Sequence, residues 1–176
     1  MTHSLQKIVV IGPESTGKST ICSALAHHFK TVWVEEYARE YLERQNNEYD
    51  YDDLLAIAKG QIMKEEEKSL LAREFLFCDT DLNVLMVWCH HRFHKVHAFI
   101  LEEIAARKYD AYVLCDVDMP WSPDPQREYP EYEMRRYFFN IYKDIVMNAG
   151  VPFIIVSGNE KERLEQALNS GLLGAR

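Results

Sequence analysis

The chain of 176 residues is 47% hydrophobic and 27% charged, proportions typical of a soluble globular protein, and we expect residues 1–176 to form a single domain. No stretch approaches the ~20 apolar residues that span a bilayer, and the first apolar run leads into a glycine loop instead of a signal-peptide cleavage site. The formal net charge of −8 argues against a nucleic-acid partner, because nucleic-acid binding depends on clustered Lys and Arg. The composition therefore predicts a cytoplasmic protein that binds small molecules and neither membrane nor nucleic acid.

The first predicted strand, residues 7–12, runs directly into a glycine-rich loop that precedes a helical pattern. The loop reads GPESTGKS and matches GxxxxGK[ST] in full, the motif whose backbone N–H groups surround the phosphates of a nucleoside triphosphate. Lys18 is expected to reach the β and γ phosphates, and the Ser19 hydroxyl to bind Mg²⁺. The sequence therefore predicts an ATP site with Mg²⁺ as cofactor, formed by Gly12, Pro13, Glu14, Ser15, Thr16, Gly17, Lys18, Ser19 and Thr20.

The next two strands are predicted at residues 31–35 and 74–79, and apolar residues at helical spacing predict a helix between them. The third strand ends in Asp79, and a fourth, residues 110–116, ends in Asp116. Either carboxylate could bind Mg²⁺, because both strands neighbour the first in the order 2-3-1-4-5 that is usual for P-loop kinases. We favour Asp79, since the third strand normally carries the metal-binding acid in such kinases.

Residues 119–130 have neither a helical nor a strand period, and four prolines exclude regular structure there. A loop of that length in a compact domain is usually functional, and we expect it to be a lid. A helical stripe follows and stops before Gly150, then a fifth strand at residues 152–157. The last helix begins with Asn159 and Glu162 in capping-box spacing and meets Gly171.

Four of the five predicted strands consist mainly of uninterrupted apolar residues, as expected of a parallel sheet covered by helices on both faces. Strands alternate with helices along the whole chain, which implies right-handed crossovers. The predicted fold is therefore a three-layer α/β/α P-loop fold with a five-stranded parallel sheet in the kinase-type order 2-3-1-4-5.

The sequence also narrows the class of P-loop protein. A GTPase should carry NKxD after a late strand, but residues 157–160 read SGNE, and 176 residues scarcely hold the extra elements of a motor ATPase. A small-molecule kinase needs carboxylates and cations around the transferred phosphate. Acidic residues follow three predicted strands, and the candidate cations are Arg39, Arg127, Arg135 and Arg136.

Longer motifs resemble the ribosylnicotinamide kinase domain of the NadR type over nearly the whole chain. They are GPESTGKST at residues 12–20, EEYAREY at 35–41, DTD at 79–81, VWCHHRFHKVH at 87–97 and CDVDMPWSPDPQR at 115–127. The set EYARE, DTD and DxPWxxDxxR is more specific than the phosphate loop alone. One departure is Asp124-Pro125, where the family usually has Asp-Gly.

The resemblance implies an ATP-dependent kinase that phosphorylates the 5′ hydroxyl of nicotinamide riboside to give nicotinamide mononucleotide. It implies catalytic roles for Lys18, Glu36, Asp79 and Arg127. It also implies a substrate site lined by Glu36, Arg39 and Asp81, over which Trp121, Asp124 and Arg127 close as part of the lid. A histidine recurs in the family at His97, which is expected to touch substrate.

Several interpretations stay open at this point. Trp121 could be a buried anchor instead of stacking on a substrate ring, and Glu36 and Arg39 could form only a surface ion pair. We expect no metal at the histidine tract of residues 90–97 and interpret the acidic run at residues 65–67 as a solvated helix face. A kinase for another nucleoside or small alcohol and a regulatory nucleotide-switch ATPase are the alternatives. The general base, the ring specificity and the oligomeric state, a homo-oligomer included, are left open.

Overall fold

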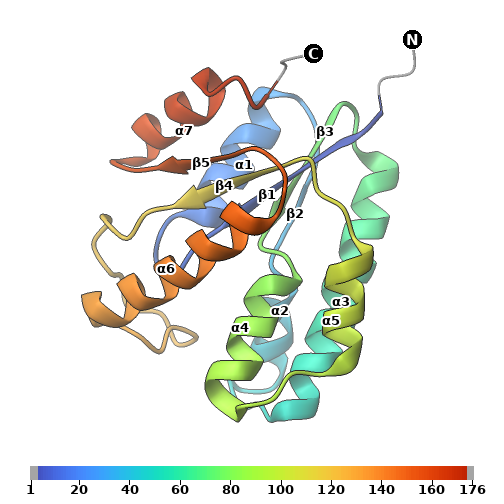
Figure 1. The fold of residues 1–176 in the computed structure, drawn as a ribbon, viewed down its shortest axis with the longest axis vertical. Coiled ribbons are helices and arrows are strands. Elements are labelled where there is room, and N and C mark those ends of the chain that lie inside the picture. Colours follow the sequence, from blue (N-terminus) through green and yellow to red (C-terminus); the bar gives the residue numbers. More distant parts are fainter. Residues whose placement is uncertain (1–3, 174–176) are drawn as a thin grey trace.

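The computed structural model describes residues 4–173, so residues 1–3 and 174–176 of the predicted domain lie outside the described range. Its centre is a five-stranded parallel sheet in the order β2-β3-β1-β4-β5, which confirms the predicted order (Figure 1). Register pairs Val10 with Asp79 on one side of the central strand and Ile11 with Leu114 on the other. The strands are β1 (Gln6–Ile11), β2 (Trp33–Val34), β3 (Phe75–Asp79), β4 (Ala111–Cys115) and β5 (Phe153–Val156).

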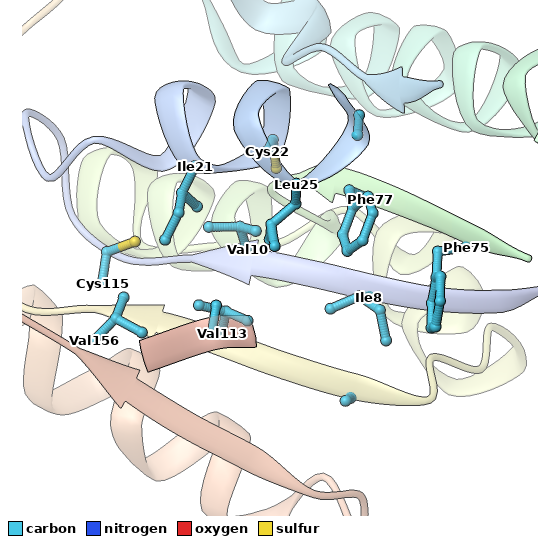
Figure 2. Close-up of a cluster of buried hydrophobic side chains, with 13 residues drawn as sticks. Ile8, Val10, Ile21, Cys22, Leu25, Phe75, Phe77, Val113, Cys115 and Val156 are labelled. Carbon is cyan, nitrogen blue, oxygen red and sulfur yellow. The ribbon is translucent and has the colours of Figure 1, made fainter. Parts of the chain in front are cut away.

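Seven helices lie along the described part of the chain and cover both faces of the sheet. On one face, α1 and α7 pack over a cluster in which Ile21 and Leu25 meet Val10 and Phe77 (Figure 2). The core on the other face includes residues of α6 and α4, and α2 to α5 share a further core of their own (Figure 1). The helices are α1 (Lys18–His28), α2 (Tyr37–Arg44), α3 (Tyr51–Leu71), α4 (Leu82–Phe93), α5 (Ala98–Ala106), α6 (Tyr132–Asn148) and α7 (Glu160–Asn169).

The helix boundaries follow the local signals in the sequence. The predicted capping box of α7 is present, with the Asn159 side chain accepting from Glu162 N and the Glu162 side chain accepting from Asn159 N. Helix α6 ends at Asn148, and Gly150 follows in a left-handed conformation with φ 72°, as predicted for a C-terminal glycine. The four cysteines are buried free thiols. Within residues 4–173, no helix combines the length and the apolar character needed to cross a bilayer.

The acidic run on α3 corrects the interpretation of a wholly solvated face. Glu66 and Glu67 are exposed, but Glu65 is only 3% exposed. Its carboxylate accepts from Lys7 Nζ at 2.8 Å and from Tyr109 OH at 2.8 Å, and Arg107 adds a contact at 3.2 Å. A buried carboxylate requires such partners, and they come from segments that the local sequence pattern cannot reveal.

Candidate functional site

The phosphate loop, residues 12–19, connects β1 to α1 and requires glycine at both ends of the motif. A Cβ on Gly12, at φ 150°, would lie 2.8 Å from the Cys115 carbonyl oxygen, so the loop passes too close to β4 for a side chain. Gly17 has φ 76° and would place a Cβ 3.2 Å from the Met119 sulfur. Two side chains of the loop bond to the loop's own backbone. Thr16 Oγ1 and Lys18 Nζ both donate to the Pro13 carbonyl, at 2.7 and 2.8 Å.

The start of α1 presents an uncompensated positive helix end to this loop. Gly17 is its N-cap and makes no side-chain capping bond, and the first turn holds no acidic residue. Backbone N–H groups at a helix start are natural partners of phosphate oxygens. The loop and the helix end therefore offer backbone donors at the place where the motif predicts a phosphate site.

Ser19 and Asp79 form the pair that best fits Mg²⁺. Ser19 Oγ donates to one carboxylate oxygen of Asp79, while the other oxygen, Oδ1, is buried and has no hydrogen-bond partner among residues 4–173. Burial, followed by the nearby Glu36 carboxylate, raises the pKa of Asp79 from its usual 3.8 to about 6. A carboxylate oxygen and a hydroxyl are ligands that Mg²⁺ accepts, and a cation would satisfy the unpartnered oxygen.

Asp116, the other candidate for the metal, has a different environment. Its Oδ1 accepts from Arg136 Nη1 at 2.9 Å and from Val117 N at 2.8 Å. The carboxylate is therefore already neutralised by an arginine and bonded to the neighbouring backbone. This arrangement favours Asp79 as the metal-binding acid.

A pocket of about 290 Å³ extends from the phosphate loop to a wall of aromatic side chains. Of the residues predicted for the substrate site, Glu36, Arg39 and Arg127 line this pocket together with the phosphate loop. Aromatic residues also line it, namely Tyr49, Trp88, His91, Tyr129, Phe138 and Tyr142. One cavity thus brings the phosphate loop together with aromatic side chains of the kind that bind a flat ring.

Arg39 is paired with the lid and not with Glu36. Its Nη1 lies 2.9 Å from Asp124 Oδ2, and its carbonyl accepts from Gln126 Nε2 at 3.0 Å. The pKa of Asp124 is lowered, first by the Gln126 backbone N–H and then by Arg39. The predicted lid is therefore held against α2, and the alternative of an isolated Glu36–Arg39 surface pair is not what the structure has.

Asp81 is not among the residues that line this pocket. It is the N-cap of α4 and only 2% exposed, and its carboxylate accepts from Asn83 N at 3.0 Å and from Tyr112 OH at 2.9 Å. Burial raises its pKa to about 6. Asp81 lines a second cavity together with Tyr109 and Asn148. The two carboxylates of the DTD motif therefore lie in different environments, because Asp79 contacts Ser19 of the phosphate loop.

Trp121 and Asp124 also lie outside the set of pocket-lining residues, although both belong to the lid. The Trp121 indole N–H donates to Glu14 Oε1 at 3.2 Å, which makes the ring an anchor of the lid on the phosphate loop. Tyr129 and Trp88, by contrast, line the pocket. Trp88 Nε1 donates to Tyr49 OH at 3.0 Å, and the two rings meet edge to face at 4.8 Å.

Known proteins resemble this chain in sequence and in fold. A family profile described as an AAA domain matches residues 7–163. The chain belongs to this AAA domain family. It is homologous to the trifunctional NAD biosynthesis/regulator proteins NadR of Salmonella typhimurium and Escherichia coli, each 26% identical over 156 residues. The match covers 86% of this chain and 38% of either relative, so the chain spans well under half of the length of these curated relatives.

Solved structures share the fold of this AAA domain. NadR in complex with NR superposes with a TM-score of 0.76 at 21% identity, covering 94% of this chain and 49% of the other. NadR in complex with NAD and AMP-PNP gives 0.72 at 23% identity with the same coverage. A thymidylate kinase from Ehrlichia chaffeensis gives 0.65 at 12% identity, over 95% of this chain and 98% of the other. The kinase-type P-loop fold is confirmed.

The histidine tract of the AAA domain spans the end of α4. The helix ends at Phe93, and His94 follows in a left-handed conformation. His97, expected to touch substrate, stacks on Tyr51 at 3.7 Å between ring centroids and lies outside the pocket-lining set. His91 is the tract residue that reaches the pocket, where its ring meets Tyr129 at 5.5 Å. In the sequence, only the place of His91 in the VWCHHRFHKVH motif indicated that it could belong to the site.

Arg163 of α7 is a structural residue of the site that sequence reasoning missed. Its guanidinium is 1% exposed and donates to the carbonyls of Gly158 at 2.8 Å, Val156 at 3.2 Å and Thr16 at 3.3 Å. It also pairs with Asp118. This one side chain connects the phosphate loop to the loops after β4 and β5. An arginine in a polar helix pattern gives no signal of such burial.

Proposed function

We propose that the chain is an ATP-dependent kinase that transfers the γ-phosphoryl group to the 5′ hydroxyl of nicotinamide riboside, giving nicotinamide mononucleotide. The observation that carries this proposal is the single pocket that joins the phosphate loop to an aromatic compartment. The homologous NadR proteins, by name, act in NAD biosynthesis, and solved NadR structures hold NR in one case and NAD with AMP-PNP in another. The shared fold and the sequence similarity support the same substrates here.

The proposed roles follow from the position of each side chain. Lys18 and the N–H groups of the phosphate loop hold the triphosphate, and Ser19 and Asp79 hold Mg²⁺, which supplies positive charge next to the phosphates. Glu36 lines the same pocket and is close enough to Asp79 to raise its pKa, so it is the carboxylate available to accept the hydroxyl proton. Arg127 and Arg39 provide the cations at the lid side.

The aromatic end of the pocket favours a flat and positively charged ring. The pyridinium ring of nicotinamide riboside carries a positive charge, and the faces of Trp and Tyr attract cations by about 0.5–2 kcal/mol each. Trp88, Tyr49 and Tyr129 supply aromatic rings to the pocket, and Glu128, which also lines it and accepts from Tyr49 OH at 2.9 Å, adds a carboxylate. A neutral nucleoside gains less from these groups.

The test is ADP release from MgATP with nicotinamide riboside, compared with adenosine, deoxyadenosine and thymidine, and with Lys18→Ala as the inactive control. Nicotinamide riboside should stimulate release at least about tenfold, with nicotinamide mononucleotide as the phosphorylated product. Stronger stimulation by a neutral nucleoside would replace the proposal by the alternative of another nucleoside kinase. ATP consumption that no nucleoside alters would favour a regulatory ATPase, a role consistent with the word regulator in the names of the relatives.

A further inference from the structure

Glu14, the third residue of the phosphate loop, binds the lid with its whole carboxylate. Oε1 accepts from Tyr129 N at 2.6 Å and from the Trp121 indole N–H at 3.2 Å, and Oε2 accepts from Glu128 N at 3.0 Å. Trp121 lies near the start of residues 119–130, and Tyr129 near the end. A single side chain of the phosphate loop therefore fastens both ends of the lid.

The neighbouring residue adds a second attachment. Ser15 Oγ accepts from Ser122 N at 2.9 Å, and Ser15 holds the left-handed backbone conformation at φ 57°, uncommon for a residue other than glycine. Two consecutive side chains of the loop thus receive N–H groups of the lid. The rest of the phosphate motif would still bind phosphate without these two contacts, because the backbone N–H groups and Lys18 provide that function.

The charge of Glu14 also needs an explanation. Within the described residues, no Lys or Arg forms an ion pair with it, and the same loop is built to receive a triphosphate. A carboxylate there repels phosphate unless its charge is stabilised in another way. The three N–H donors of the lid provide that stabilisation, since bonds from N–H groups to a carboxylate are stronger than neutral ones. The acidic residue is thus suited to lid attachment and not to nucleotide binding.

Tyr129 connects this attachment to the ring end of the pocket. Its backbone N–H is held by Glu14, and its side chain lines the aromatic compartment, 5.0 Å from the Phe138 ring and 5.5 Å from the His91 ring. Glu14 thus connects the backbone of a pocket-lining aromatic residue to the phosphate loop.

We propose that Glu14 is a positioning residue that fixes the lid, and with it the Tyr129 wall of the nucleoside compartment, onto the phosphate loop. The inference rests on the proposed function for its kinetic consequence, but the attachment of the lid can be measured without turnover. Glu14 touches neither the transferred phosphoryl group nor the acceptor hydroxyl in this role. It acts through Tyr129 and Trp121.

The kinetic test compares Glu14→Ala, Glu14→Gln and Glu133→Gln with the wild type. Glu14→Ala removes three charge-assisted bonds, so the KM for the nucleoside should rise at least about tenfold, while the KM for ATP stays within about threefold. Glu14→Gln keeps one oxygen for Tyr129 N and Trp121 and loses the acceptor for Glu128 N, so it should rescue most of the nucleoside affinity. Glu133→Gln removes the same charge from an exposed residue in the first turn of α6, and both KM values should stay unchanged.

The second test is limited digestion by trypsin, with the Arg127–Glu128 bond of the lid as the reporter. Cleavage there needs the lid to leave the phosphate loop, so Glu14→Ala should be cut several times faster than wild type or Glu133→Gln, at equal thermal stability. Trp121→Phe removes one of the three donors and keeps an aromatic ring. Its cleavage rate should therefore lie between those of the wild type and Glu14→Ala. Mass spectrometry of the fragments identifies the bond.

The outcomes separate this inference from the proposed function. Faster cleavage of Glu14→Ala together with a higher nucleoside KM supports it. Faster cleavage in a protein whose wild type phosphorylates no nucleoside supports the attachment and refutes the proposed kinase activity. Unchanged cleavage of Glu14→Ala overturns the inference, and so does faster cleavage with an unchanged nucleoside KM, because the lid would then open without consequence for the ring site.

Discussion

Replacing Asp79 by asparagine should raise the stability of the protein and lower its kinase activity. Asp79 is 1% exposed, and its pKa is raised from 3.8 to about 6. Because the folded protein holds the proton more tightly than the unfolded chain, stability falls as the pH rises from 3.8 to 6 and stays low above that range. At about 1.4 kcal/mol per pKa unit, keeping this carboxylate ionised at pH 7 costs about 3 kcal/mol.

The Asp79→Asn substitution would remove that cost and introduce a smaller one. The carboxylate oxygen without a partner becomes an amide N–H without a partner, which costs about 1 kcal/mol. The net gain in the free energy of unfolding at pH 7 should be about 2 kcal/mol. At pH 5 the wild-type carboxylate is largely protonated, and the advantage of the variant should shrink by about 1 kcal/mol.

The assay is urea unfolding of wild type and Asp79→Asn at pH 7 and pH 5 without nucleotide, followed by a Mg²⁺ titration of the kinase rate. The matched control is Asp116→Asn, which breaks the pair with Arg136 and should bring no gain in stability. A variant less stable than wild type, by an amount independent of pH, would refute the argument from burial. A raised Mg²⁺ requirement in Asp116→Asn but not in Asp79→Asn would reverse the metal assignment.

Three further predictions follow from the site. Lys18→Ala should lower the rate of phosphoryl transfer about 100-fold or more in steady-state assays, because the ammonium stabilises charge on the transferred group; near-normal turnover would contradict the phosphotransferase proposal. Trp88→Ala should raise the KM for nicotinamide riboside about tenfold with little change in the KM for ATP, and an unchanged value would exclude this ring from the substrate wall. Arg163→Ala removes the guanidinium that donates to the carbonyls of Thr16, Val156 and Gly158 and that pairs with Asp118, so chemical denaturation should show a loss of about 3 kcal/mol or more, whereas a change below about 1 kcal/mol would contradict the structural role.

The sequence alone determined the sheet, its flanking helices and the phosphate loop. These features are encoded locally, since apolar runs, helical periods and capping residues each report on a few neighbouring positions. Gly12 and Gly17 could be assigned from the motif, and the structure confirms the close backbone approach at Gly12 that only glycine allows. The strand order was also predictable, because it followed from the motif and its family and not from pairing preferences.

Only the tertiary structure decided which residues each of these side chains contacts. Asp79 and Asp81 are two positions apart, yet the first faces Ser19 and the second faces Tyr112, because the end of β3 turns into α4 between them. Trp121 was expected either to stack on a substrate ring or to anchor the loop, and its contact with Glu14, more than 100 residues earlier in the chain, makes it an anchor, whereas Tyr129 lines the pocket. Periodicity reports which side of an element is covered and carries no information about which distant residue covers it. Which residues meet when they are far apart in the sequence depends on how the helices pack over the sheet. That packing is determined by the fold as a whole.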